Sequence, residues 1–175
     1  MRFAVHGCSV ALVAMLLSAW GFGEQSKGGT TKRGETVQKS TAVRLFNPET
    51  MAKPTAGYSQ VGEIRNGKIV MIAGQVALDK SGNLVGKDDF RAQVQQVFEN
   101  LKAAVEAAGG SFQDVVKLNY FCAESVDPAQ IPVVREIRDK YVNTANPPTS
   151  TFVVVKRLVR PEWLIEVEAV AVVMK

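Results

Sequence analysis

Residues 164–173 read Leu-Ile-Glu-Val-Glu-Ala-Val-Ala-Val-Val, an alternating pattern from which the architecture of the domain follows. Successive side chains of a β-strand point to opposite faces of the sheet. One face therefore takes the odd-numbered residues from Ile165 to Ala171, and the other takes the even-numbered residues, among them Glu166, Glu168 and Val170. Both faces carry apolar side chains. If helices cover one face, the other stays apolar and open, which predicts oligomerisation through that face.

Four more strands are expected before this one. Residues 151–155 are β-branched or aromatic throughout, as in a strand covered on both faces. Residues 115–122 are also expected to form a strand. Residues 58–64 and 68–75 flank Arg65-Asn66-Gly67. Asn-Gly between apolar runs is a strong hairpin signal, because both residues tolerate a positive φ.

Two helices are expected between the strands. The first is capped by Asp88, ends at Gly109-Gly110, and has apolar residues at helical spacing: Phe90, Val94, Val97, Phe98, Leu101, Ala104 and Val105. The second opens at Asp127-Pro128 and ends before Pro147-Pro148, with an apolar stripe made by Ile131, Val134, Ile137 and Tyr141. The predicted order is ββαβαββ, an α+β layer with two helices on one face of a mixed sheet.

The first 45 residues are expected to lie outside this domain. Residues 1–23 carry Arg2, an apolar run and then small residues, the three-part pattern of a secretory signal peptide that is too short to span a membrane. We therefore expect an exported protein with no membrane span in the mature chain; an uncleaved anchor is the main alternative. Residues 24–45 are polar and predict a flexible linker. The folded domain is assigned to residues 46–175.

Charge and composition exclude several classes of function. Residues 46–175 hold 15 basic and 15 acidic residues, so the net charge of +4 arises before the domain. This balance argues against a nucleic acid as partner. His6, in the leader, is the only histidine, which excludes Ser-His-Asp and Cys-His sites and His-ligated metals from the mature chain. Once the leader is removed, Cys122 is the only cysteine, and it is expected to be a core residue. No cofactor is expected.

The domain resembles the Rid (reactive intermediate deaminase, or YjgF) family almost from end to end. The matching segments, in order, are Gly57-Tyr58-Ser59-Gln60, Ile72-Ala73-Gly74-Gln75, Gln96-Val97-Phe98-Glu99-Asn100-Leu101, Ala107-Ala108-Gly109, Pro147-Pro148-Thr149-Ser150-Thr151 and Glu166-Val167-Glu168-Ala169. The resemblance implies a chorismate-mutase-like fold. It also implies a homotrimer with small-molecule sites at the subunit interfaces, in agreement with the open apolar face.

The resemblance also implies a chemistry: active members hydrolyse reactive enamines and imines to carbonyl compounds and ammonia. The family's tyrosine falls on Tyr58, its strand glycine on Gly74 and its water-activating glutamate on Glu166. Its carboxylate-binding arginine falls on Ser150. Shifting the alignment with the family by one or two residues would not restore the arginine, because no residue from Pro148 to Thr151 is basic.

Losing this arginine matters because a guanidinium binds a carboxylate through two charge-assisted hydrogen bonds, whereas a serine hydroxyl cannot. Two explanations stay open. The ligand is neutral, with Ser150 and Thr151 offering hydroxyl groups, or Arg135 or Arg138 of the second helix reaches the pocket from a neighbouring subunit.

Two functions of different classes follow. The first is an enamine or imine deaminase in which Glu166 and water hydrolyse a carbon-nitrogen double bond. The second is a non-catalytic, trimeric module that binds a small molecule in the same interface pocket. The retained Glu166 favours the first, and the missing arginine favours the second. Ribonuclease activity is disfavoured by the neutral domain and the lack of histidine.

Overall fold

The computed structural model describes residues 42–174. The predicted signal peptide and the linker up to residue 41 lie outside the described residues. The strands are β1 (Val43–Phe46), β2 (Val61–Ile64), β3 (Lys68–Gln75), β4 (Val115–Ala123), β5 (Thr149–Val155) and β6 (Ile165–Val173). The helices are α1 (Phe90–Ala107) and α2 (Pro132–Arg138), with short 3-10 turns at Phe112–Asp114 and Pro128–Gln130.

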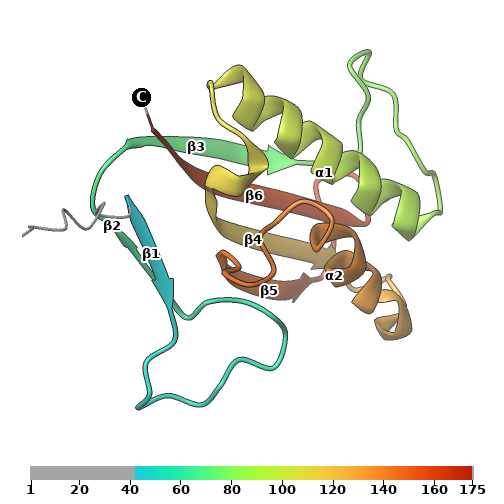
Figure 1. Ribbon diagram of the computed structural model, residues 1–175. Helices are drawn as coiled ribbons and strands as arrows, with labels where there is room; N and C mark the ends of the chain where they lie inside the picture. Colours follow the sequence, from blue (N-terminus) through green and yellow to red (C-terminus); the bar gives the residue numbers. More distant parts are fainter. Residues whose placement is uncertain (1–41, 175) are drawn as a thin grey trace, which may run out of the picture. The chain divides into compact units, whose positions relative to one another are not determined.

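Four strands form a mixed sheet in the order β3-β6-β4-β5, in which only β4 and β5 run parallel (Figure 1). Both helices lie on one face of this sheet. The predicted α+β layer is therefore confirmed, with one further strand, β1, at the start. The first three residues of β1 fall within the segment predicted as linker.

The strand β6 alternates as its sequence requires. Its odd-numbered residues from Ile165 to Ala171 are buried under the helices, and Glu166, Glu168 and Val170 are partly exposed on the other face. That other face is called the open face below. The core on the helix side is built around fully buried residues from four elements: Val94, Val97, Phe98, Leu101, Leu118, Cys122, Ile137, Ile165 and Val167.

The predicted hairpin between residues 58–64 and 68–75 is wrong. β2 pairs with β1 in a separate two-stranded sheet, with Val61 opposite Phe46, and β3 pairs with β6. The residues between β2 and β3 still turn, with Gly67 at a φ of 116°, but they carry the chain from one sheet to the other. The turn signal was local, whereas the pairing depended on Val43–Phe46, an apolar partner far from β2 in the sequence.

The predicted cap of the first helix was one residue early. Asp89 is the N-cap, and its carboxylate accepts a hydrogen bond from the backbone N–H of Ala92 at 3.0 Å. Asp88 instead has a φ of 60° in the turn before the helix. The predicted end at Gly109 is confirmed, since this residue follows the helix at a φ of 86°.

The second helix is shorter than predicted. Asp127 caps the 3-10 turn through a hydrogen bond from the N–H of Ala129, and the α-helix starts only at Pro132. Val134 and Ile137 of the predicted stripe are buried, while Tyr141 lies beyond the helix end.

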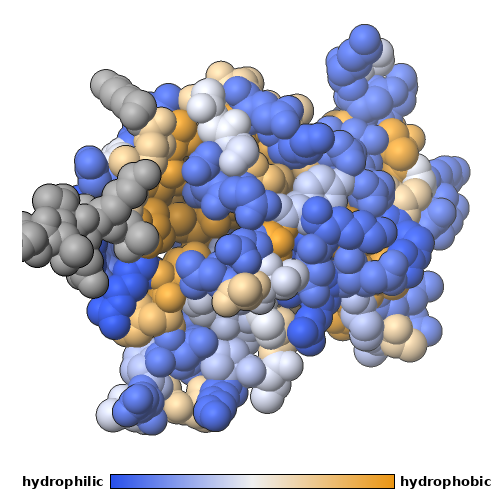
Figure 2. Space-filling model, viewed as in Figure 1, coloured by the Kyte–Doolittle hydropathy of each residue, from blue (hydrophilic) through white to orange (hydrophobic). Residues whose placement is uncertain are grey.

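In Figure 2 the side of the molecule on which α1 lies is mostly hydrophilic. Neither helix in residues 42–174 has the length and apolar character needed to cross a bilayer.

Candidate functional site

Gly74 and Glu166 lie against each other on the open face. A Cβ atom on residue 74 would come within 1.9 Å of Oε1 of Glu166, so the carboxylate occupies the space that any other residue would fill. The pairing of β3 with β6 shifts register between Ile72 and Gln75, and this irregularity contains Gly74. The two residues that the sequence assigned to the strand glycine and the water-activating glutamate are therefore neighbours.

The two glutamates of β6 have different surroundings. Glu168 accepts a hydrogen bond of 2.6 Å from Nδ2 of Asn119, its partner on β4. The side chain of Glu166 makes neither a hydrogen bond nor an ion pair among residues 42–174. Its carboxylate is partly exposed and free to bind a water or a substrate. The two carboxylates therefore differ: the Glu168 side chain is hydrogen-bonded and the Glu166 side chain is not.

Thr151 shares the open face with Glu166. It stands opposite Asn119 of β4, which in turn stands opposite Glu168 of β6. Cross-strand partners point to the same side of a sheet, so all three side chains emerge together. A shallow cavity of about 240 Å³ lies beside them, lined by Met71, Ile72, Lys117, Asn119, Glu168, Ala169 and Val170.

Ser150 lies on the opposite face from Glu166. It stands opposite Leu118, which is fully buried under the helices. On that side Ser150 lines a cavity of about 410 Å³ between β5, α2 and the loop before β2, together with Ala56, Tyr120, Ile131, Pro132, Val134, Arg135, Arg138 and Phe152. One chain therefore does not bring Ser150 together with Glu166.

Tyr58 belongs to the loop that closes this helix-side cavity. Its neighbour Ser59 is buried and anchored to the start of β5, donating its hydroxyl to the carbonyl of Pro147 at 2.7 Å and its N–H to the carbonyl of Pro148 at 3.2 Å. Gly57 has a φ of 63°, and a Cβ atom there would lie 3.2 Å from Nη2 of Arg135. Tyr58 itself is half-buried and lines none of the cavities described here.

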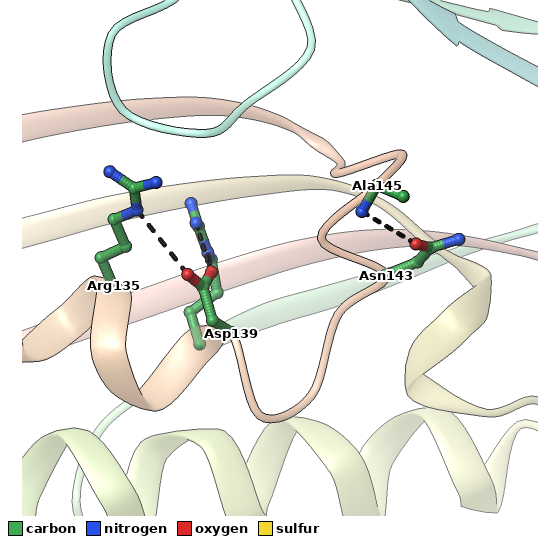
Figure 3. Close-up of polar contacts among 5 residues, drawn as sticks. Arg135, Asp139, Asn143 and Ala145 are labelled. Atoms are coloured by element: carbon green, nitrogen blue, oxygen red, sulfur yellow. Dashed lines mark hydrogen bonds and ion pairs between the residues drawn. The ribbon is translucent and has the colours of Figure 1, made fainter.

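The two arginines of α2 share one carboxylate (Figure 3). Arg138 donates to Oδ1 of Asp139 from Nε at 2.9 Å and from Nη2 at 2.5 Å, while Nε of Arg135 lies 3.6 Å from Oδ2. Figure 3 also draws Asn143, whose side chain accepts from the N–H of Ala145 in the loop before β5. Arg138 is buried, with 7% of its side chain exposed, whereas Arg135 is 55% exposed.

Sequence reasoning missed Tyr120 as a site residue. It is 3% exposed, it lines the helix-side cavity, and its hydroxyl has no hydrogen-bond partner among the described residues, although Arg138 lies nearby. Burial raises the pKa of Tyr120 above its ordinary value, partly offset by the Arg138 charge. The hydroxyl therefore stays protonated and is available as a donor. An alternating strand gives no signal that one tyrosine will keep an unpaired hydroxyl.

These residues form two groups with different chemistry. The open face offers an unpaired carboxylate beside a glycine, and the helix side offers guanidinium groups, hydroxyl groups and aromatic walls. Residues 42–174 contain no cluster of three or more His, Cys, Asp or Glu side chains placed to hold a metal ion. Cys122 is 1% exposed, and burial raises the pKa of its thiol to about 11, so it is a core residue.

Comparison with known proteins connects this arrangement to a family. The family model described as Endoribonuclease L-PSP matches residues 49–173. A RutC family protein of Pyrococcus horikoshii is 39% identical over 124 residues, covering 70% of this chain and 92% of the relative. The 3-aminoacrylate deaminase RutC of Acinetobacter baylyi is 32% identical over 127 residues, covering 73% of this chain and 95% of the relative.

A solved structure gives the same result. The Rid-family protein YyfB of Yersinia pestis, described as of unknown function, superposes with a TM-score of 0.67 at 36% identity, covering 76% of this chain and all of the other. The fold, the order of the matching segments and the extent of the family match agree. The chain therefore belongs to the Rid/YjgF family, whose family model is described as Endoribonuclease L-PSP.

Proposed function

We propose that this protein hydrolyses reactive enamines or imines to a carbonyl compound and ammonia, with Glu166 as the group that moves protons. The observation that carries the proposal is the Glu166 carboxylate, unpaired among the described residues and held against Gly74. A relative that is 32% identical is named a 3-aminoacrylate deaminase, an activity on an enamine. The neutral folded domain gives no support to a nucleic-acid substrate.

The chemistry needs one carboxylate and one water. An enamine first takes a proton on carbon and becomes an imine. Glu166 then accepts a proton from water as the water oxygen bonds to the imine carbon, while the nitrogen gains a proton. In the resulting carbinolamine Glu166 takes the hydroxyl proton and a proton is delivered to the nitrogen, so that the C–N bond breaks and releases a carbonyl compound and ammonia. A positioned proton-transfer group typically contributes about 10²- to 10⁴-fold to such a rate.

We propose that the site is completed between subunits of a homotrimer. Within one chain Glu166 and the Ser150 cavity lie on opposite faces of the sheet, so a second copy is needed to bring a helix-side group to an open face. The open face is suited to such contact because it exposes apolar side chains: Met71 is 83% exposed, Ile69 is 53% exposed and Val153 is 38% exposed.

The test is ammonia release by the full-length chain from imines generated in situ from amino acids and from neutral amines. We expect activity in the wild type and a loss of at least about 10²-fold in Glu166→Gln. The matched control is Glu168→Gln. Glu168 lies on the same strand and the same face as Glu166, but its carboxylate is already hydrogen-bonded to Asn119. Equal activity in the Glu166→Gln and wild-type proteins would overturn the proposal.

A second function is favoured by a specific observation, the absence of any basic residue at positions 148–151. A wild-type protein that releases no ammonia from any imine but binds small molecules would be a trimeric binding module.

We also propose that residues 1–23 direct export. Detection of a shortened chain outside the cytoplasm, with its new N-terminus near residue 24, would support this, and full-length protein retained inside the cell would contradict it.

A further inference from the structure

The helix-side cavity has a mostly apolar lining that also includes the guanidinium groups of Arg135 and Arg138 and the hydroxyl group of Ser150. Tyr120 and Phe152, whose rings stack at 5.6 Å, form one wall, and Ile131 and Val134 form the other. This cavity is about 410 Å³, large enough for a ligand with an aromatic or branched body.

The charges around this cavity do not cancel. Arg135 and Arg138 together carry two positive charges, and Asp139 supplies a single negative charge between them. The next carboxylate along the helix, Glu136, is already bound to Arg91 at 2.7 Å and lies near Lys140. The cavity therefore keeps an excess of one positive charge.

Arg135 is the group that can use this excess. Arg138 is buried and its Nε and Nη2 both donate to Asp139. The side chain of Arg135 meets Asp139 only through Nε at 3.6 Å and makes no hydrogen bond within residues 42–174, which leaves its donors available. A guanidinium with free donors binds a planar carboxylate through two parallel hydrogen bonds.

We propose that Arg135 binds the carboxylate of the substrate, while Tyr120 and Phe152 contact its apolar body. The inference rests on the proposed function and narrows it to substrates that carry a carboxylate and a sizeable apolar group. The guanidinium absent from β5 is then supplied by α2, into the cavity that Ser150 also lines. Arg135 sets specificity, and Glu166 performs the chemistry.

The first experiment measures binding and needs no catalysis. Isothermal titration calorimetry compares phenylpyruvate with its neutral amide, using the full-length wild type, Arg135→Gln and Arg65→Gln. We expect the wild type to bind the acid about 10- to 100-fold more tightly than the amide, and Arg135→Gln to lose this preference. Arg65→Gln is the control, because Arg65 is 42% exposed and paired to the carboxylate of Glu63 but lies between β2 and β3, outside the cavity.

Either of two results would overturn the inference. One is a wild type that binds neither compound or both equally, and the other is an Arg135→Gln protein that keeps its preference for the acid. Measuring ammonia release distinguishes a failure of the inference about Arg135 from a failure of the proposed deaminase function. If Glu166→Gln abolishes activity but Arg135→Gln leaves KM for an acidic imine unchanged, the deaminase stands and the role of Arg135 falls. If the acid preference depends on Arg135 in a chain that releases no ammonia, the proposed function falls instead.

Discussion

Ser150 and Glu166 lie on opposite faces of one sheet, although both were assigned to a single pocket from the sequence. The strand β4 lies between them, pairing Leu118 with Ser150 on the helix side and Phe121 with Glu166 on the open side. A side chain placed at residue 150 therefore enters the cavity of Arg135, and one placed at residue 151 does not.

This geometry predicts where a relocated arginine will work. In an Arg135→Gln background, we expect Ser150→Arg to restore about tenfold preference for phenylpyruvate over its amide, because the new guanidinium enters the same cavity. Thr151→Arg should restore nothing in a binding assay, because Thr151 faces the other way. Calorimetry measures both, and recovery in Thr151→Arg alone would show that the acid binds on the open face.

The contact between Gly74 and Glu166 predicts the effect of one methyl group. In Gly74→Ala the new Cβ would lie 1.9 Å from Oε1 and 2.8 Å from Cδ of Glu166, so the carboxylate must move. We expect kcat for imine hydrolysis to fall at least about tenfold, since a misplaced proton-transfer group is ineffective. Gly82→Ala is the control: the methyl group meets nothing within 4 Å, and although the φ of 82° makes alanine cost some stability, kcat of the folded protein should be unchanged. Full kcat in Gly74→Ala would contradict the contact.

Gln93 is a buried hydrogen-bonding centre that holds two loops to α1. Its Nε2 donates to the carbonyls of Gly86 at 3.1 Å and Glu162 at 2.9 Å, and its Oε1 accepts from the N–H of Leu164 at 2.9 Å. Gln93→Leu would leave the carbonyl of Glu162 and the N–H of Leu164 without partners, while the carbonyl of Gly86 still accepts from the N–H of Asp89. We expect this change to lower the free energy of unfolding by about 3 kcal/mol.

Urea denaturation followed by circular dichroism measures this loss. Gln95→Leu is the matched control, because Gln95 bonds only to the side chains of Glu99 and Tyr141 near the surface. Its cost should stay below about 1 kcal/mol. Equal costs for the two variants would show that burial of Gln93 is unimportant.

The open face predicts the basis of assembly. Met71 is 83% exposed on β3, beside Val170 of β6. We expect Met71→Glu to dissociate the oligomer, because burying an unpaired carboxylate in an apolar interface is costly. Sedimentation velocity gives the mass of each species. Val159→Glu, at a residue 77% exposed in the loop after β5, should leave the oligomer intact. An intact oligomer in Met71→Glu would exclude this part of the open face from the interface.

Cys122 predicts a pH effect with a defined sign. Burial raises the pKa of its thiol from 9.0 to about 11, so the unfolded chain loses this proton first as the pH rises. The free energy of unfolding should therefore fall between about pH 9 and pH 11, with a slope of up to about 1.4 kcal/mol per pH unit from this group. Cys122→Ala should remove that part of the slope in urea titrations. Iodoacetamide at pH 8 should label the Cys122 peptide only after unfolding, and rapid labelling of the folded protein would contradict its burial.

The sequence by itself determined the parts of this protein that depend on local pattern. The alternation of residues 164–173, the helical spacing of residues 90–107 and the glycine after that helix each specify an element through near neighbours, and the structure contains all three. The order of the matching segments was also sufficient to identify the family. The alternation of β6 also determined that Glu166 lies on the face opposite the helices.

Tertiary structure decided the rest, because it depends on contacts between distant residues. The partner of β2 is β1 rather than β3, and no turn signal encodes that choice. The face taken by Ser150 depends on the register between β5 and β4, and a shift of one residue reverses the face of every side chain in a strand. Arg138 is buried and Arg135 left available only because of how α2 packs on the sheet. Local pattern fixes which elements form, and packing alone determines which side chains meet.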